Sequence, residues 1–405
     1  MKDPEKHRKA LCLLNFSGRY GGAEKRYATL FRYLMDEGCD HYLIMNRGLY
    51  RLFIDNGLLI PHSQIIVFND RAENGSGQKF RESKPGAKPF SGIPQTGLRL
   101  FFGRLKYFLK TTLLWMRFSY FFVVQARRMR IKKLYGVWQG GIWTWMWCRF
   151  LGIELIYSVN ASEKLMLYPQ WYKFFDSQYF VLKHARVIDF LSPALLKAYR
   201  TRMGPKMQGK AVVTPNSFVD THLFFPEFPK QPKVVFMARI EPLKNPLMFV
   251  EAVAALKNEE LPAGAFFFMA GDGHLLSPIQ EEVRDRGLHN IFFTGPHSRP
   301  WELLRNASIF VSLQAAENYP SQSLMEAMAC GCAIMATDVG ETRRLVTEQE
   351  GLLVDPSVPE VAMAIKKLLG NPALCEKLGK NARKKIRNEH TIESFAGWYR
   401  SLMNG

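Results

Sequence analysis

Several patterns are missing from this chain of 405 residues, and each absence excludes a class of protein. No GxGxxG pattern of dinucleotide-binding proteins occurs, and no GxxxxGK[ST] pattern of P-loop NTPases. No run of eighteen residues is free of charge, which argues against a transmembrane helix. Tandem repeats of the solenoid type are absent as well. The hydrophobic content of 47% is nevertheless that of a globular protein.

Acidic residues are missing between Glu82 and Glu154. This gap contains the segment Arg99–Lys133, in which ten Lys and Arg alternate with Phe, Leu, Trp and Tyr. Residues 1–210 hold 35 Lys and Arg against 14 Asp and Glu, a net charge of +21, whereas residues 211–405 have a net charge of −2. An amphipathic helix on an anionic membrane surface fits this segment best. A buried helical hairpin with a solvated basic face and a nucleic-acid surface are alternatives, although no nucleic-acid motif is present.

Cysteines are few and scattered, at positions 12, 39, 148, 330, 332 and 375. Most have apolar neighbours, which is typical of buried free thiols and not of a disulfide framework. No second Cys/His pair has the spacing to complete a metal site with Cys330 and Cys332. The first residues, MKDPEKHRK, are charged and lack the apolar stretch of a signal peptide. We therefore expect a cytoplasmic protein, peripheral at the cytoplasmic face of the membrane.

Strands and helices are predicted to alternate along the chain, which favours parallel sheets with helices on both faces. Strands are expected at residues 10–16, 41–46, 65–68, 134–139, 153–158 and 187–191, then at 234–238, 266–271, 291–294, 309–313, 334–337 and 352–354. The predicted fold class is α/β, with two doubly wound, Rossmann-like domains whose sheets face each other across a cleft. The expected parts are a first domain (1–215) carrying the basic insertion 99–133, a linker (216–233) in the proline-rich stretch 214–233, a second domain (234–385), and a terminal helix (386–405) that packs back on the first domain.

The most informative stretch is ENYPSQSLMEAMACG, residues 317–331. It follows an apolar strand and opens a helix, whose first N–H groups lack partners and favour phosphate. Glu326 lies one to two turns into that helix, where its carboxylate can accept hydrogen bonds from sugar hydroxyls. Arg239 and Lys244 follow another strand and can neutralise a diphosphate leaving group. These features together predict a site for a nucleotide-sugar.

These stretches resemble the nucleotide-sugar signature of retaining GT-B glycosyltransferases of family 4, also called glycosyltransferase group 1. The EAMACG core of that family is intact at residues 326–331. Family members separate two glutamates by seven residues, whereas eight residues separate Glu317 from Glu326. Either the turn carries one extra residue, or Asn318 takes the place of the first glutamate.

The resemblance implies roles for individual residues. Arg239, Lys244 and the helix N-terminus near Ser321 and Ser323 would stabilise the leaving nucleoside diphosphate, and Glu326 would hold the ribose. Further donor-binding residues would lie in the turn before the helix and in four other loops: Glu317 or Asn318, Tyr319, Gly21, Gly22, Asn216, Gly271, Pro296 and His297. Asn160 occupies the acceptor-side position where the family often has a histidine.

The function implied is retaining transfer of a sugar from a UDP- or GDP-linked donor to a saccharide or lipid-linked acceptor, in the synthesis of a cell-surface polysaccharide or glycan. No Asp-x-Asp pair, which holds the metal in GT-A transferases, occurs in the chain, so neither a metal nor another cofactor is expected. The expected partners are the donor, the acceptor and an anionic membrane surface, without nucleic acid. A GT-B-type epimerase or phosphorylase and a non-catalytic scaffold on the membrane are the alternatives.

Overall fold

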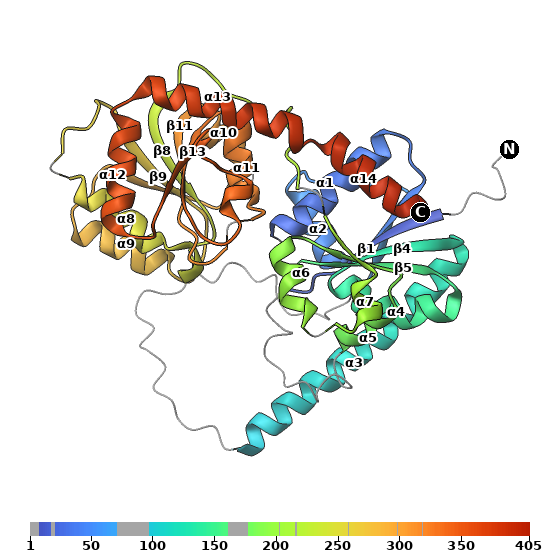
Figure 1. Cartoon of the computed structure of the whole chain (residues 1–405). Helices are drawn as coiled ribbons and strands as arrows, with labels where there is room; N and C mark the ends of the chain where they lie inside the picture. Colours follow the sequence, from blue (N-terminus) through green and yellow to red (C-terminus); the bar gives the residue numbers. More distant parts are fainter. Residues whose placement is uncertain are drawn as a thin grey trace. The chain divides into compact units, whose positions relative to one another are not determined.

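A computed structural model describes residues 8–17, 21–70, 97–160, 177–201, 203–214, 217–257, 259–297, 299–317 and 319–405. The chain divides into two compact units. The first unit comprises Met1–Asp189 and Arg200–Val212, and the second comprises Phe190–Tyr199 and Val213–Gly405. Figure 1 shows a sheet with helices packed around it in each unit. The expectation that the terminal helix returns to the first domain stays a prediction.

The first sheet has seven strands in the order β3-β2-β1-β4-β5-β6-β7. Its strands are β1 (Arg8–Leu13), β2 (His41–Asn46), β3 (Ile65–Phe68), β4 (Ile131–Val137), β5 (Glu154–Val159), β6 (Val187–Phe190) and β7 (Ala211–Val213). The helices of this part of the chain are α1 (Gly22–Asp36), α2 (Arg47–Asp55), α3 (Gly97–Arg128), α4 (Gln139–Leu151), α5 (Ser177–His184), α6 (Pro193–Arg200) and α7 (Pro205–Gln208). Each described register in this sheet is parallel.

The second sheet has six strands in the order β10-β9-β8-β11-β12-β13, again with parallel registers. Its strands are β8 (Gln231–Met237), β9 (Phe266–Ala270), β10 (Ile291–Gly295), β11 (Ala307–Ser312), β12 (Ala333–Thr337) and β13 (Gly351–Val354). The helices are α8 (Pro246–Ala255), α9 (Leu276–Asp285), α10 (Pro300–Leu304), α11 (Gln322–Ala329), α12 (Val358–Leu369), α13 (Pro372–Glu389) and α14 (Ile392–Asn404), with short 3₁₀ turns η2 (Pro242–Lys244) and η3 (Thr342–Arg344).

Both faces of the second sheet are buried, because successive side chains of a strand point to opposite faces. On β8, Val234 and Phe236 belong to one apolar cluster, and Val235 belongs to another. The first cluster includes residues of α8, α9 and α12, and the second includes residues of α10, α11 and α13. The carboxyl ends of the strands are therefore fixed between two packed layers of helices.

Two features of the first unit go beyond what the sequence predicted. The hairpin named as an alternative for the basic segment is excluded, because α3 is one continuous helix that ends at Arg128. Arg130 adopts the left-handed conformation, with a φ of 53°, and ends the helical run. Lys132 and Lys133 consequently lie on β4 and not on the helix. The three-residue strand β7 was not predicted.

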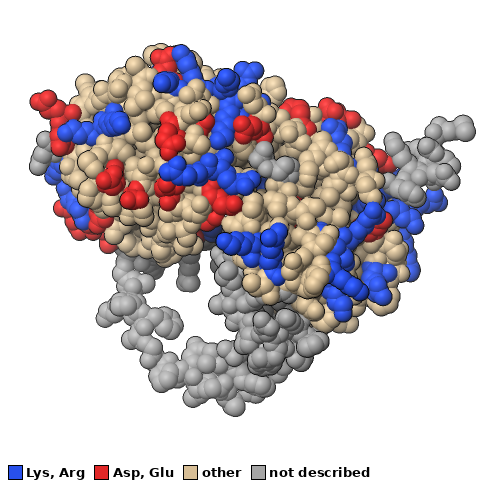
Figure 2. Space-filling model, viewed as in Figure 1, with Lys and Arg blue, Asp and Glu red and all other residues tan. Residues whose placement is uncertain are grey.

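The two units differ in charge, as the sequence predicts. Figure 2 shows Lys and Arg mixed with Asp and Glu over the second unit, whereas Lys and Arg predominate on the face of the first unit that is in view. Among the helices of the described chain, none combines the length and the hydropathy needed to cross a bilayer.

Two glycines let the loop after β9 lie against the end of β8. Gly271 has a φ of 138°, and a Cβ atom there would lie 1.9 Å from the carbonyl oxygen of Ala238. A Cβ atom on Gly273 would lie 2.3 Å from the carbonyl oxygen of Ile240. The Ile240 N–H donates to the backbone carbonyl of Asp272, in the same loop, at 3.0 Å. The two strand ends are thus in backbone contact, and this contact fixes where the loop after β8 begins.

The close approach at Gly273 predicts a large effect of one methyl group. Gly273→Ala should lower the free energy of unfolding by about 1–3 kcal/mol, because backbone atoms must move to admit the Cβ. Gly397→Ala is the matched control, since Gly397 is exposed on α14 with open space around its Cβ position. That control should be neutral or stabilising by up to about 1 kcal/mol. Denaturant unfolding measures both, and equal midpoints for Gly273→Ala and the parent protein would contradict the packing argument.

Candidate functional site

The order of strands in the second sheet reverses between β8 and β11. The chain proceeds outward from β8 to β9 and β10 on one side, and from β11 to β12 and β13 on the other. Ligands of open α/β sheets bind at such a switch point, at the carboxyl ends of the strands. Here Lys244, which follows β8, donates from Nζ to Oε1 of Gln314, which follows β11, at 2.8 Å. The Ala315 N–H donates to the Leu243 carbonyl at 3.0 Å and joins the same two loops.

Lys244 is a half-buried cation with a neutral partner. It forms no salt bridge with any carboxylate in the described part of the chain. The pKa of Lys244 is lowered to about 8, chiefly by burial and also by the nearby Arg239, whereas Glu241 opposes the change. Arg239 itself is exposed and contacts Glu241 at 3.3 Å. The two cations share one neighbourhood, and an anion that bound there would offset the cost of burying Lys244.

The residue after Lys244 explains how the loop turns into α8. Asn245 adopts a left-handed conformation with a φ of 50°. Asparagine tolerates this conformation better than most residues. Asn245 therefore suits the turn that leads from η2 into α8.

Helix α11 begins beside this pair of loops and carries the buried carboxylate of Glu326. The side chain of its N-cap residue, Ser321, makes no capping bond, so it leaves the first amides of the helix to other partners. Ser323 is half-buried in that first turn. Glu326 is 3% exposed, and its Oε1 accepts from Gln322 Nε2 at 3.4 Å. Gln322 also donates to the carbonyl of Phe218 at 3.3 Å, which ties α11 to the chain that enters the unit.

Two cationic side chains donate hydrogen bonds to the carbonyl groups at the C-terminal end of α11. Lys230 donates to the carbonyl of Cys330 at 2.6 Å, and Arg383 donates to the carbonyl of Ala329 at 2.5 Å. Cations at a helix C-terminus complement the helix dipole, whose positive end here is the turn at Ser321. The chain thus neutralises the negative end of α11 with its own side chains.

The turn before α11 is held by the carboxylate of Glu317. Its Oε1 accepts from the N–H of Tyr319 at 2.9 Å and from the N–H of Glu341 at 3.0 Å. Gly340, with a φ of 54°, passes so close that a Cβ atom would lie 2.7 Å from this carboxylate. Tyr319 is buried, and the guanidinium of Arg344 lies 5.0 Å from the centre of its ring. Glu317 therefore joins the turn after β11 to the loop after β12.

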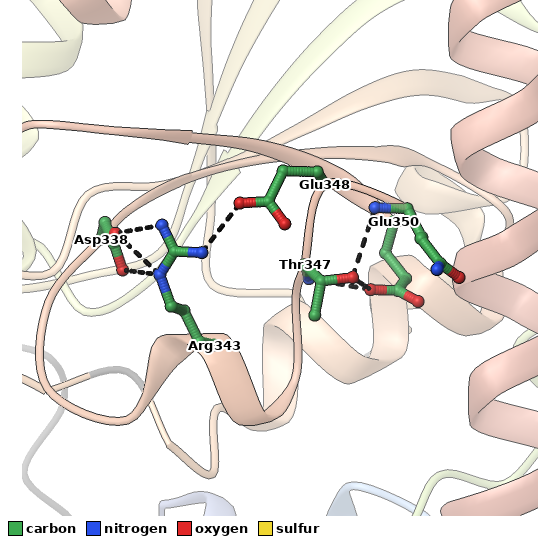
Figure 3. Close-up of polar contacts among 6 residues, drawn as sticks. Asp338, Arg343, Thr347, Glu348 and Glu350 are labelled. Carbon is green, nitrogen blue, oxygen red and sulfur yellow. Dashed lines mark hydrogen bonds and ion pairs between the residues drawn. The ribbon is translucent and has the colours of Figure 1, made fainter.

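The loop after β12 is closed by a second set of contacts, drawn in Figure 3. Arg343 donates to both carboxylate oxygens of Asp338, at 2.7–3.1 Å, and to Glu348 at 2.8 Å. The hydrogen bonds from the backbone and from Arg343 lower the pKa of Glu348. Next to them, Glu350 accepts from the N–H and the hydroxyl of Thr347 at 2.8 Å each. Arg343 thus bridges the start and the end of the loop that contacts Glu317.

The remaining donor residues predicted in this unit lie along the same edge of the sheet. Gly271 follows β9, and Pro296 and His297 follow β10 and are exposed. Asn216 and Asn318 lie outside the described residues. Of the predicted residues in this unit, a hydrogen bond joins Glu317 to Tyr319, and Arg239 lies near enough to Lys244 to lower its pKa.

Of the three predicted positions in the first unit, Gly21 and Gly22 lie at the start of α1. The Gly21 N–H donates to the carboxylate of Glu24 at 2.9 Å, and Asn15 Nδ2 donates to the same carboxylate at 2.7 Å. Glu24 is thus an acid of the first turn of α1 that accepts from the N-cap amide. The Gly21 amide thus has an internal partner, and Gly22 begins α1.

Asn160 follows β5 and ends a buried polar network. Its Oδ1 accepts from Arg26 at 3.0 Å and its Nδ2 donates to Ser158 Oγ at 3.3 Å. The network continues through Tyr27, whose hydroxyl lies 2.8 Å from Ser158 Oγ, and through Tyr135, which donates to Asp189. Burial and the Asp189 carboxylate raise the pKa of Tyr135 well above its ordinary value.

Sequence reasoning missed Gln314, Arg343 and Arg26. Gln314 is a neutral residue in LQAAEN, and only the adjacency of β8 and β11 brings it to Lys244, 70 positions away. Arg26 lies 134 positions from Asn160 and gives no local signal in the sequence. Within the described chain, no cluster of three or more His, Cys, Asp or Glu side chains is arranged to hold a metal ion.

Comparison with protein families supports the reading of the second unit. Residues 220–385, less than half of the chain, match the family described as Glycosyl transferases group 1. The chain is 28% identical to D-inositol 3-phosphate glycosyltransferase of Jonesia denitrificans over 42% of this chain and 43% of that protein. It is 26% identical to an undecaprenol-linked glycan α-1,4-N-acetyl-D-galactosaminyltransferase of Campylobacter jejuni, over 44% and 50%. The chain thus spans about half the length of these curated relatives.

Solved structures resemble the whole chain. The Anabaena protein Alr3699/HepE, determined with UDP and glucose, covers 98% of this chain with all of its own length, at a TM-score of 0.72 and 16% identity. Sucrose-phosphate synthase of Thermosynechococcus elongatus covers the same share, at a TM-score of 0.68 and 18% identity. The predicted α/β fold class is therefore confirmed: two Rossmann-like units with parallel sheets, as in these GT-B neighbours.

The contacts of Arg343 predict a local change without global unfolding. Arg343→Gln should release the loop 338–350, because Asp338 and Glu348 lose their shared partner. Hydrogen exchange of the amides of this loop, and of Glu341 in particular, should become faster. Arg284→Gln, at an exposed position of α9, is the matched control and should leave these amides unchanged. Equal exchange in Arg343→Gln and the parent would show that the bridge does not order the loop.

Proposed function

We propose that this chain is a retaining glycosyltransferase that moves a sugar from a nucleoside diphosphate donor to a saccharide or lipid-linked acceptor. The donor diphosphate would lie at the switch point of the second sheet, between Arg239, Lys244 and the N-terminus of α11. Departure of the nucleoside diphosphate leaves negative charge on its terminal phosphate, which these groups would stabilise without a metal. Positioning and charge stabilisation would carry most of the rate.

The observation that carries this proposal is the environment of Lys244. Its side chain is half-buried, is held by the neutral amide of Gln314, and forms no salt bridge within the described chain. Desolvation makes such a cation costly, as its lowered pKa shows. A buried cation kept at the switch point of a Rossmann-like sheet fits an anionic ligand better than a structural role.

The carboxylates would complete donor binding. Glu326 lies within α11, close to its first turn, and would accept hydrogen bonds from the ribose hydroxyls. Glu317 or Asn318 would bind hydroxyls of the donor sugar. Glu317 already accepts two backbone N–H groups, so it would contact the sugar from a position that the turn itself fixes. The loop after β12, which Arg343 bridges, would hold the turn before α11 in place.

The partners follow from the same chemistry and from the relatives. We propose UDP as the first nucleotide to test, because the Anabaena neighbours were determined with UDP or UDP-glucose, with GDP as the alternative. The Campylobacter relative is named for an undecaprenol-linked acceptor, which supports a lipid-linked acceptor and synthesis of a surface glycan. Asn160 would face the acceptor. We also propose a peripheral location at the cytoplasmic face of an anionic membrane, in agreement with the basic first unit.

The decisive test is a screen of nucleotide-sugars by thermal shift, followed by product analysis with the labelled donor that stabilises the protein. Transfer of the sugar to a polyprenyl-linked or free saccharide with retained anomeric configuration is the expected result. Epimerised donor, or phosphorolysis without transfer, would replace the proposal by one of its alternatives. Binding without turnover on any acceptor would favour a scaffold. Activity should persist in EDTA, and its full loss would show that a metal is required.

Lys244 predicts both the strength and the pH dependence of donor binding. Lys244→Ala should weaken UDP binding by about 1.5–3 kcal/mol, roughly 10- to 150-fold, because a charge-assisted contact is lost. In the parent protein the free lysine is charged below pH 8 and neutral above it. A bound diphosphate raises the pKa of Lys244, so affinity should fall as pH rises through 8, by up to about tenfold per pH unit.

Lys244→Arg is the control for this pH dependence. A guanidinium stays charged throughout this range, so the decline above pH 8 should disappear even if affinity at neutral pH is reduced. Isothermal titration calorimetry with UDP at several pH values measures all three proteins. Unchanged affinity of Lys244→Ala, or the same decline in Lys244→Arg, would remove Lys244 from the donor site.

Glu326 predicts a loss of donor binding without loss of the fold. Glu326→Gln keeps the shape of the side chain but removes its charge and one acceptor, so donor affinity and turnover should fall by about tenfold or more. Circular dichroism should be unchanged. Glu317→Gln and Asn318→Ala, measured separately, should show which residue binds the donor sugar. Normal turnover in Glu326→Gln would contradict its role, and normal turnover in both others would leave the sugar-side role to a different residue.

A further inference from the structure

The outer face of helix α3 is apolar. Five large side chains lie exposed on it, and their exposed fractions are Leu109 58%, Leu113 60%, Met116 57%, Tyr120 76% and Val124 40%. These positions recur every three or four residues, so they lie on one side of the helix within about 80° of arc. We call these five residues the α3 stripe. A continuous exposed stripe of this kind is unusual on a soluble surface and marks an interaction site.

The opposite side of α3 is packed into the first unit, which fixes the direction of the stripe. Phe118, Phe122 and Ala126 are buried, with at most 2% of each exposed. The ring of Phe118 lies 5.3 Å from that of Phe68 and 5.6 Å from that of Trp143. The stripe therefore cannot turn inward without breaking this core, and Figure 1 shows α3 running along the first unit and projecting beyond it.

Cations border the α3 stripe along one edge. Lys110, Arg117 and Arg128 are exposed and spaced by seven and eleven residues, which are two and three helical turns, so they form a line beside the stripe. The chain has no Asp or Glu between Glu82 and Glu154, so no carboxylate of this segment neutralises them. An apolar stripe with a cationic edge is the surface of a helix that lies in the headgroup region of a membrane.

We propose that the α3 stripe inserts into an anionic lipid bilayer, with its bordering cations on lipid phosphates. This inference deepens the membrane partner proposed above by naming the inserting residues, and it does not depend on the chain being a transferase. Lys110, Arg117 and Arg128 would lie at the depth of the phosphates while the apolar side chains reach the acyl chains. A second copy of the chain fits less well, because antiparallel pairing of two such faces brings their cationic edges together and leaves those charges without anionic partners.

The experiment measures co-sedimentation of the full chain with vesicles of phosphatidylcholine and phosphatidylglycerol, and with vesicles of phosphatidylcholine alone, at physiological salt. The parent protein should bind the anionic vesicles. A stripe variant, Leu113→Gln with Met116→Gln and Tyr120→Gln, and an edge variant, Lys110→Gln with Arg117→Gln and Arg128→Gln, should each bind about tenfold more weakly or worse. The residual binding of the stripe variant should still weaken as the salt concentration rises, whereas the residual binding of the edge variant should not depend on salt.

Two control proteins match these changes elsewhere on the surface. Arg51→Gln with Lys183→Gln and Lys206→Gln removes the same charge from other exposed positions of the first unit and should bind like the parent. Ile60→Gln with Phe228→Gln and Met363→Gln removes exposed apolar side chains away from α3 and should bind likewise. A loss of binding in the charge control equal to that of the edge variant would mean that net charge alone attracts the protein, which overturns the proposal.

Other outcomes would also overturn it. If the parent protein stays in the supernatant with anionic vesicles, the α3 stripe does not bind such membranes. A stripe variant whose mass in solution falls from dimer to monomer would identify a second copy as the partner. A stripe variant with a lower unfolding temperature would show that another segment of the chain covers the stripe. UDP binding should be the same in all variants, so failure at the membrane and failure at the donor site are separate results.

Discussion

The hydrogen bond between Lys244 and Gln314 is the contact on which the arrangement of the second unit's site depends. It joins the ends of two strands that are neighbours in the sheet but lie far apart in the chain, at the point where the strand order reverses. A neutral partner leaves the lysine charge uncompensated, so the surroundings must supply either water or an anion. The helix that starts nearby has its negative end already capped by Lys230 and Arg383. The uncompensated charge of Lys244 and the N-terminus of α11 therefore both create positive potential at the switch point of the second sheet.

Much of the fold could be predicted because the strands are short apolar runs bounded by turns. Strands β2 and β3 have the predicted limits, and the strands of the second sheet differ by a few residues at most. The periodicity of apolar residues does not predict where an element ends when the backbone conformation of one residue determines that end. The residues around Arg130 do not indicate that Arg130 adopts a left-handed conformation, after which the chain continues as β4 with Lys132 in it. Strand β7 has three half-buried residues, too few to show a period.

The candidate site could be predicted only where its chemistry is local. Arg239 and Lys244 share one loop, and Glu326 lies on the helix that its own motif begins. Gln314 and Arg343 act through contacts that exist only once the strand order and the loop path are fixed. The Glu317 carboxylate shows the same limit: its spacing suggested a sugar ligand, whereas the structure first shows it accepting two backbone amides. A sequence gives residue types, and a fold decides which of their atoms are already in use.

The network in the first unit fixes the orientation of one amide. Tyr135 donates its single hydrogen to Asp189, so Tyr27 is the donor to Tyr135, whereas the Ser158 hydroxyl has two acceptors within reach, Tyr27 at 2.8 Å and Asp189 at 3.5 Å. With either acceptor the Ser158 oxygen accepts from Asn160 Nδ2, and Asn160 Oδ1 accepts from Arg26. A hydroxyl on one side and a guanidinium on the other thus set the orientation of the Asn160 amide. An amide takes up no proton near neutral pH, so a substrate that meets this position finds a fixed dipole and not a base.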